Sequence, residues 1–232
     1  MLYIVSTPIG NLKDITLRAI ETLKSVDVIA AEDTRHTRKL TETYQITTPL
    51  TSYFEHNQIK KADYLLGLLK EGKNVALVTD AGTPGISDPG FHLIRLAQHN
   101  NIPMTVVPGP CALIAGLTLS GLPAHDFVFA GFLPPKSAAR RRKLERFKEE
   151  RRTVIFYESP HRLLKTLEDI CDVLSDPHTV CGRELTKKFE EVRRGRCSEL
   201  LREFSRRSIK GEFVLLVHSA MEKNEDEAVI EE

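Results

Sequence analysis

The first 109 residues alternate between short apolar runs and longer segments suited to helices, and no other feature restricts the fold as much. Five runs have the length and composition of strands: residues 2–6, 26–31, 48–54, 74–79 and 103–109. The helical segments between them are residues 14–26, 34–44, 58–71 and 89–100. Such regular alternation is typical of a parallel sheet with helices on its faces. We therefore predict an N-terminal α/β domain with a mostly parallel five-stranded sheet.

The pattern changes between residues 108 and 126, which are rich in glycine, proline and small side chains. Five more strand-like runs follow: residues 127–133, 153–159, 179–185, 190–195 and 212–218. The last of them lie close together, so we predict a mixed sheet with helices in the C-terminal half. The predicted division is one domain at 1–113, a second at 114–220 and a solvated acidic tail at 221–232.

Composition narrows the class of protein. The chain has 232 residues and a net charge of only +1, which argues against a tail-driven nucleic-acid binder but permits a local basic patch. No apolar run approaches the length of a membrane span, and the N-terminus has no signal-peptide pattern, so we expect a cytoplasmic protein. The four cysteines form no C-x-x-C pair, which predicts buried free thiols in place of a zinc site or disulfides.

Four segments that contain glycine or proline each follow a predicted strand: residues 6–11, 79–90, 108–113 and 158–162. Ligands of open α/β sheets bind outside the carboxyl ends of the strands. We therefore expect the four segments to converge on one cleft between the domains. Rigid turns needed only for folding are the structural alternative.

Known phosphate and metal motifs do not account for these segments. The sequence lacks G-x-G-x-x-G spacing, a P-loop, H-E-x-x-H and any His/Cys ligand cluster. Asp80 and Asp88 could hold Mg²⁺, but Asp88 followed by Pro89 is better explained as the N-cap and first residue of a helix, and no metal is expected. Small side chains and abundant backbone groups suit a ligand that carries its own ammonium, carboxylate and ribose hydroxyls.

Residues 30–40, AAEDTRHTRKL, place two carboxylates and then several basic groups after a strand. Arg35, His36 and Arg38 could bind phosphate, and Asp33 or His36 could orient or deprotonate a hydroxyl. The structural alternative is a solvated helix start, since acidic residues suit helix N-termini.

Residues 136–152 hold nine basic and three acidic residues. Arg140, Arg141 and Arg142 are consecutive, so they cannot share one helical face. Together with RRGR at 193–196 they predict an electrostatic footprint for an RNA backbone, with a solvated helix face as the alternative.

Eight blocks of sequence resemble the ribosomal RNA small-subunit methyltransferase I family: STPIGNLKDITLRA, AAEDTRHTRKL, VTDAGTPGISDPG, PGPCALIAGLTLSGLP, GFLPPKS, FYESPHRL, RELTKKFEEVRRG and KGEFVLLV. They extend over nearly all of residues 2–218. The resemblance implies a two-domain α/β fold of the tetrapyrrole-methylase-like superfamily. It also implies S-adenosylmethionine-dependent 2′-O-methylation of a cytidine ribose in small-subunit (16S) ribosomal RNA, by a homodimer that acts on this RNA or on the assembled small subunit.

The same resemblance implies a set of residues that line S-adenosylmethionine between the two domains. They are Ile9, Gly10, Ala81, Gly82, Thr83, Ile86, Cys111 and Ala112, joined by Glu158 and Leu185 from the second domain. Gly211 and Glu212 are further candidates. The wider superfamily has an aspartate where this chain has Thr83, so a carboxylate contact is not carried over to that position.

Methyl transfer from a sulfonium is an in-line displacement, so the enzyme must align the two partners and remove the hydroxyl proton. The candidates for that proton acceptor are Asp33, His36 and Lys187, in this order. Arg35, Arg38 and the arginines at 140–142 would position the RNA.

Two other functions remain open from the sequence. A methyltransferase of a small tetrapyrrole-like metabolite is one, and the basic segments argue against it. A non-catalytic RNA-binding assembly factor is the other, and the intact loops argue against it.

Overall fold

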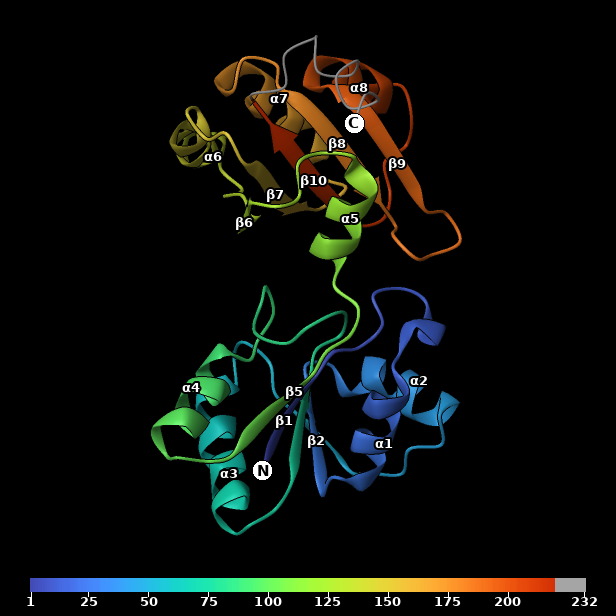
Figure 1. Ribbon diagram of the computed structural model, residues 1–232, viewed down its shortest axis with the longest axis vertical. Helices are drawn as coiled ribbons and strands as arrows, with labels where there is room; N and C mark the ends of the chain where they lie inside the picture. The colour runs from blue at the N-terminus through green and yellow to red at the C-terminus, as the bar shows by residue number, and fades with distance from the viewer. Residues whose placement is uncertain (220–232) are drawn as a thin grey trace. The chain divides into compact units, whose positions relative to one another are not determined.

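The computed structural model describes residues 1–219, and the chain divides into two compact units between Cys111 and Ala112 (Figure 1). The acidic tail predicted at 221–232 lies outside the described residues. Within residues 1–219, no helix is long and apolar enough to cross a membrane. Each unit is built around its own five-stranded sheet.

The N-terminal unit contains a fully parallel sheet with strand order β3-β2-β4-β1-β5. Its strands are β1 (Leu2–Val5), β2 (Val28–Ala31), β3 (Leu50–Ser52), β4 (Val75–Val78) and β5 (Met104–Val107). Its helices are η1 (Leu12–Asp14), α1 (Leu17–Ser25), α2 (Thr34–Thr43), α3 (Gln58–Lys70) and α4 (Phe91–His99). This arrangement confirms the predicted parallel α/β architecture.

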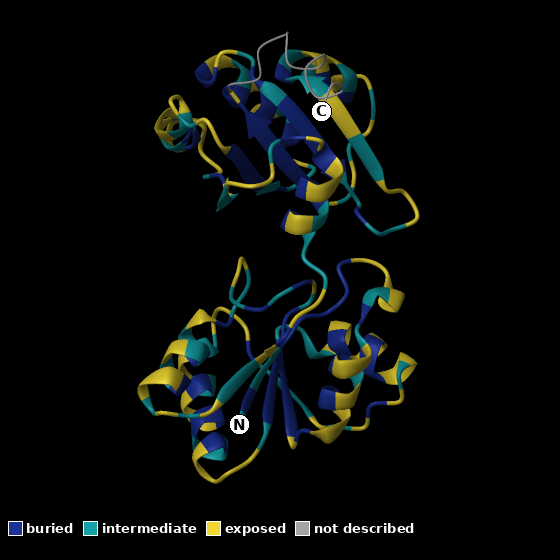
Figure 2. Ribbon diagram, in the orientation of Figure 1, coloured by how far each residue is buried: buried dark blue, intermediate teal, exposed yellow. Residues whose placement is uncertain are grey.

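Helices cover both faces of this sheet, which is why its central strands are apolar throughout. Every residue of β2 and β4 is buried (Figure 2). Neighbouring residues of a strand enter different cores because side chains alternate between faces. In β2, Ile29 packs into the core formed with α1 and α2, whereas Ala30 packs into the core formed with α3 and α4.

The start of helix α4 differs from the prediction. The helix begins at Phe91 and its N-cap is Gly90, so Asp88 and Pro89 lie before the helix. Gly90 packs directly on Gly85: a Cβ added at Gly90 would lie 2.8 Å from the Gly85 nitrogen. The loop therefore folds back on itself before the helix starts, and this tertiary contact overrides the local N-cap signal.

The C-terminal unit contains a mixed sheet with strand order β6-β7-β10-β8-β9, in which only β6 and β7 are parallel. Its strands are β6 (Phe127–Phe132), β7 (Thr153–Glu158), β8 (His178–Arg183), β9 (Glu191–Arg196) and β10 (Phe213–His218). Its helices are α5 (Ala112–Ser120), α6 (Ser137–Leu144), η2 (Glu145–Phe147), α7 (Leu163–Val173) and α8 (Cys197–Ser205). The predicted mixed sheet is confirmed.

Helix α5 was not predicted from the sequence. Its residues, ALIAGLTLS, are apolar on nearly every side, so they show no 3.6-residue periodicity. Gly116 allows α5 to approach β10 closely, since a Cβ there would lie 3.0 Å from a methyl carbon of Val214. The four cysteines are free thiols, with Cys181 and Cys197 buried and Cys111 and Cys171 half-buried.

Candidate active site

The carboxyl ends of β1, β2, β4 and β5 meet at one edge of the N-terminal sheet, because all these strands run parallel. These strands are followed by the loops at residues 6–11, 32–33, 79–90 and 108–111. We call this set of loops the N-terminal edge, because it belongs to the N-terminal unit. Three of the four predicted segments contribute to it. The fourth, residues 158–162, follows β7 in the C-terminal unit.

Thr7 fixes the loop at 79–90 against the loop that follows β1. Its N–H donates to the Gly82 carbonyl (2.9 Å), and the Gly82 N–H donates back to the Thr7 carbonyl (3.1 Å). The buried Thr7 hydroxyl donates to the Thr79 carbonyl (2.9 Å). Ser6 and Thr83 add a hydrogen bond between their hydroxyls (2.9 Å). Gly82 adopts φ +84°, a conformation that favours glycine, so the residue type follows from this turn.

Three carboxylates, those of Glu32, Asp33 and Asp80, gather at the same edge. Glu32 accepts hydrogen bonds from the Thr79 hydroxyl (2.5 Å) and the Asp80 N–H (3.2 Å). Asp80 accepts one from the Asp33 N–H (3.1 Å). Burial raises the pKa of the Asp80 carboxyl; the Asp33 donor opposes this rise and the Glu32 charge adds to it. Asp80 is therefore a better proton acceptor than an ordinary exposed aspartate.

Asp33 lies in a contrasting environment at the start of helix α2. Its carboxylate caps the helix by accepting from the Arg35 N–H (2.8 Å) and receives the Arg35 guanidinium at Nε (3.1 Å) and Nη2 (2.7 Å). These side-chain and backbone hydrogen bonds hold the pKa of Asp33 well below its usual range. Such a carboxylate orients a cation well but accepts a proton poorly. His36 and Arg38 are exposed on α2. The positive charge of His36 opposes the rise in the pKa of Asp80.

Lys187 lies in the C-terminal unit between two carboxylates. Its Nζ is 2.8 Å from Glu184 Oε1 and 2.8 Å from Glu212 Oε2. Burial alone would lower the pKa of Lys187, but the two carboxylates outweigh it and raise the pKa above its usual value. An ammonium held in this way donates hydrogen bonds and is a poor proton acceptor at neutral pH.

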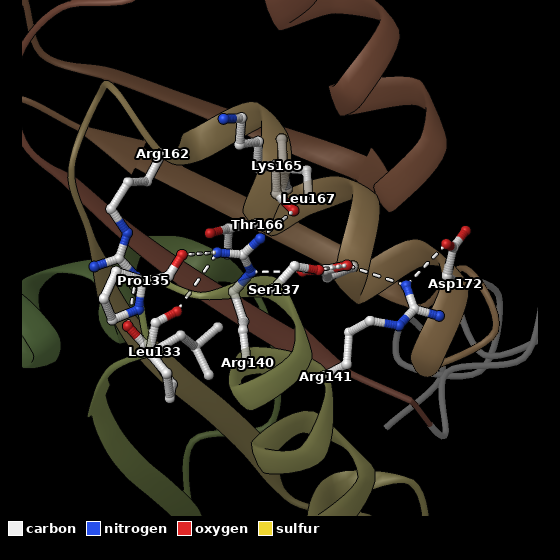
Figure 3. A network of polar contacts seen from close by, with 12 residues as sticks. Leu133, Pro135, Ser137, Arg140, Arg141, Arg162, Lys165, Thr166, Leu167 and Asp172 are labelled. Atoms are coloured by element: carbon white, nitrogen blue, oxygen red, sulfur yellow. Dashed lines mark hydrogen bonds and ion pairs between the residues drawn. The ribbon is translucent and has the colours of Figure 1, made fainter.

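The three consecutive arginines of α6 lie in three different environments, and Figure 3 shows those of Arg140 and Arg141. Arg140 is 2% exposed, and its Nε donates to Asp169 Oδ2 at 2.6 Å. Arg141 is paired with Asp169 and Asp172, each at 3.0 Å. Arg142 is exposed and has no ion pair within residues 1–219. The expectation that Arg140 contacts RNA is therefore wrong, because its guanidinium is buried in an internal network.

The arginines of the second predicted basic cluster, at 193–196, also make contacts within the C-terminal unit. Arg193 pairs with Glu191 (2.8 Å) and Glu203 (3.1 Å). Arg194 donates to the Ser120 and Leu119 carbonyls, and Arg196 donates to the Asp176 carbonyl. Within residues 1–219, only Arg193 of these three arginines is therefore paired with acidic side chains.

Comparisons with known proteins place the chain in a family. The family model described as "Tetrapyrrole (Corrin/Porphyrin) Methylases" matches residues 1–201. A protein of Escherichia coli O157:H7 named "Ribosomal RNA small subunit methyltransferase I" is 50% identical over 229 residues, which are 97% of this chain and 80% of that protein. A protein of the same name from Synechocystis is 49% identical over 95% of this chain and 79% of its own length. The chain belongs to the tetrapyrrole (corrin/porphyrin) methylases, in the ribosomal RNA small subunit methyltransferase I branch.

The fold of this tetrapyrrole methylase is shared with distant members. A uroporphyrin-III C-methyltransferase from Thermus thermophilus, solved with S-adenosylhomocysteine, superimposes with a TM-score of 0.66 at 21% identity, over 93% of this chain and 96% of that one. This superposition confirms the fold class, whereas the resemblance inferred from the eight sequence blocks is confirmed by the family model and the two relatives named above.

Most residues that the resemblance implied for the cofactor lie on the N-terminal edge of this tetrapyrrole methylase. Gly10, Ala81 and Ile86 are exposed there, and Thr83 and Cys111 are half-buried. Ile9 and Gly82 are buried in the N-terminal unit, and Ala112 begins helix α5 of the C-terminal unit.

Glu158 and Leu185 both lie in the C-terminal unit of this methylase. The Glu158 carboxylate is buried and accepts from the Thr166 hydroxyl (2.6 Å) and Arg162 Nη2 (3.2 Å). Leu185 is buried against Gly182. Both side chains thus have structural contacts within their own unit.

Sequence analysis missed the roles of Ser6, Thr7, Glu32 and Asp80 at this edge of the methylase. A usable signal was present: STP follows the first strand, and Glu32 and Asp80 each follow a buried apolar strand. Because parallel strands end together, polar residues after neighbouring strands were candidates for mutual contact. Within the described residues, no group of three His, Cys, Asp or Glu side chains could hold a metal ion.

Proposed function

We propose that this protein transfers the methyl group of S-adenosylmethionine to the 2′-hydroxyl of a cytidine ribose in small-subunit ribosomal RNA. The observation that carries the proposal is the 50% identity, across 97% of the chain, to a protein named "Ribosomal RNA small subunit methyltransferase I". The resemblance of the eight sequence blocks adds the 2′-hydroxyl of a cytidine. Relatives at 14–21% identity that methylate other substrates share the fold, and they supply no comparable support for a small-metabolite substrate.

The residues of the N-terminal edge fit S-adenosylmethionine. Gly10 and Gly109 are exposed and have no side chain, so their main chain is open to hydrogen bonding with a ligand's polar groups. The carboxylates of the edge complement a ligand with cationic sulfonium and ammonium groups. Ile9, Gly10, the residues from Ala81 to Thr83, Ile86, Cys111 and Ala112 would hold it, with Glu158 and Leu185 as further candidates. When bound, the cofactor supplies a methyl group on a sulfonium, which is a good leaving group.

The environments of the candidate residues decide how the hydroxyl proton is best removed. Asp33 and Lys187 are each held by opposite charges that stabilise their ionised forms, so they favour orienting roles. Asp80 has a raised pKa, so Asp80 and His36 are the two preferred candidates for the proton acceptor. Arg35 and Arg38 beside them would hold the phosphates that flank the reacting ribose, and Arg142 of helix α6 would contact the RNA backbone elsewhere.

The proposal is tested by incubating the purified protein with methyl-labelled S-adenosylmethionine and small ribosomal subunits from cells that lack this gene. The RNA is then digested and its 2′-O-methylnucleosides are mapped. We expect label on a single cytidine ribose, and none on subunits from cells that retain the gene, where the position is already modified. Cofactor binding without labelled RNA would favour a small-molecule substrate, and absence of cofactor binding would favour a non-catalytic assembly factor.

We further infer that the protein acts in the cytoplasm, where it would meet small ribosomal subunits, and that it works as a homodimer. The resemblance of the eight sequence blocks supports both points. Light scattering of the purified protein tests the dimer, with the mass of one chain as the contradicting result.

A further inference from the structure

The consecutive arginines of α6 have separate tasks because successive helical residues point about 100° apart. Arg140 shares the inward face with Leu144, and both are buried. Arg142 in α6 and Arg146 in the adjoining η2 are four positions apart along continuous helical backbone, and both are exposed on the side that we call the outward face. Whatever fixes the rotation of this helix therefore decides which cations reach solvent.

A single carboxylate, that of Asp169 on helix α7, fixes the rotation. It accepts hydrogen bonds from the Ser137 hydroxyl (3.0 and 3.1 Å), Arg140 Nε (2.6 Å) and Arg141 Nη1 (3.0 Å). The side chain is only 8% exposed. Burial would raise the pKa of Asp169, but these donors outweigh it and lower the pKa, so the carboxylate is charged at neutral pH. Three residues in the first turns of α6 thus converge on one buried anion (Figure 3).

The chain leading into α6 is held by the same network. Arg140 also donates to the Pro135 carbonyl (3.2 Å) and to the Lys165 carbonyl of α7 (3.3 Å). Arg162 donates to the Leu133 carbonyl just before the helix. Lys143 ties the helix to β6 by donating to the Ala130 carbonyl (2.7 Å). Arg140, which makes two of these contacts, is itself held by Asp169, so the carboxylate also governs how the start of α6 is attached to its surroundings.

The outward face of α6 carries charge that nearby acids do not neutralise. Arg142 and Arg146 are exposed and form no ion pair within residues 1–219. Neighbouring cations are compensated: Lys148 pairs with Glu145, and Arg152 pairs with Glu150. Exposed, unpaired cations on one face are the feature that attracts a nucleic-acid backbone.

We propose that Asp169 is a positioning residue: it fixes the orientation of α6 so that Arg142 and Arg146 face RNA phosphates, while Arg140 and Arg141 hold the helix in place through their contacts with Asp169. This proposal rests on the proposed function, which supplies the RNA. Of the arginines predicted to bind RNA at 140–142, Arg140 and Arg141 then have a structural role and Arg142 a binding role.

The test compares Asp169→Asn with Asp172→Asn as the matched control. Asp172 lies on the same helix and meets only Arg141 in this network, with 65% of its side chain exposed. We expect Asp169→Asn to raise the KM for small subunits about tenfold, as loss of one to two phosphate contacts would, with kcat and the Kd for S-adenosylmethionine unchanged. The control keeps the wild-type KM. A folded Asp169→Asn protein with a wild-type KM would overturn the proposal.

A second variant leaves the contacts of Asp169 intact. Arg142→Ala combined with Arg146→Ala changes exposed side chains only, so it folds as the wild type does. We expect the slope of log K against log salt for RNA binding to fall by about 2, near 0.9 for each phosphate contact. An unchanged slope would refute the RNA-facing role. If Asp169→Asn does not fold, Ser137→Ala removes one donor to the same carboxylate, and the KM should still rise.

Failure of the proposed function is distinguishable from failure of this proposal. Binding of small-subunit RNA by filter retention needs no methyl transfer, so the salt slope can be measured on a protein that methylates nothing. Loss of labelling with an intact slope effect would refute the reaction and leave the role of α6 standing.

Discussion

Gly90→Ala is the sharpest test of how the loop at 79–90 is built. A Cβ at this position would lie 2.8 Å from the Gly85 nitrogen, 3.1 Å from the Gly85 Cα and 3.3 Å from the Pro84 carbonyl carbon. All three are backbone atoms, so no side chain can rotate away, and the loop itself must move. Inserting one methyl group into packed surroundings of this kind costs about 1–3 kcal/mol.

Gly67→Ala is the matched control, because it adds the same atom where there is room. Gly67 lies within helix α3, and a Cβ there meets nothing within 4 Å. Alanine is the better helix former, so we expect the free energy of unfolding to rise by about 0.5–1 kcal/mol. The two alanine variants should therefore differ by about 1.5–4 kcal/mol, with opposite signs relative to wild type.

Urea unfolding of the three proteins, followed by far-UV circular dichroism, measures the difference from the shift in midpoint at constant slope. Isothermal titration with S-adenosylmethionine adds a functional measure, because Gly90→Ala displaces a proposed cofactor loop and Gly67→Ala does not. We expect the cofactor to bind Gly90→Ala more weakly and Gly67→Ala as it binds wild type. A Gly90→Ala protein as stable as wild type would refute the close approach of Gly90 to Gly85.

Three more predictions follow from the site. Asp80→Asn should lower kcat by about 10²- to 10⁴-fold. A normal kcat would exclude Asp80 as the acceptor. The same variant should be more stable than wild type at pH 7, because the raised pKa of Asp80 means that its ionised form destabilises the folded state above pH 3.8, the ordinary pKa. Urea unfolding at a series of pH values should show this gain in stability disappear below pH 3.8. Arg35→Ala should let the pKa of Asp33 rise toward 3.8 in a carboxyl-carbon NMR titration, and no rise would mean that another donor holds it down. N-ethylmaleimide should modify half-buried Cys111 more slowly when S-adenosylhomocysteine is present. Buried Cys181, whose pKa is raised by burial, should stay unmodified with or without the ligand. Mass spectrometry of each cysteine measures both, and a Cys111 that the ligand does not protect would count against its place at the cofactor.

Much of the fold could be predicted because the local patterns agree with the tertiary arrangement. Strands β2 and β4 are apolar at every position, which is what burial on both faces of a parallel sheet requires. Helix α5 escaped notice for the opposite reason: an almost uniformly apolar helix has no periodic pattern to detect.

The candidate site was predicted as a set of loops but not as a set of contacts. Glycine and proline after the strands marked the loops at 6–11 and 79–90. The pairing of Thr7 with Gly82 joins residues 75 positions apart, and no local signal encodes it. The same holds for Asp80, whose raised pKa depends on burial and on Glu32 from a different strand.

The sequence by itself determined that three consecutive arginines in a helix must point in different directions, because the helical step allows nothing else. It could not determine which of them enters the interior. That was decided by Asp169, 29 residues further along the chain, whose buried charge is stabilised only where Arg140 can reach it. The helical period sets the angle between successive side chains, whereas packing against the rest of the unit decides which side of the helix faces the interior.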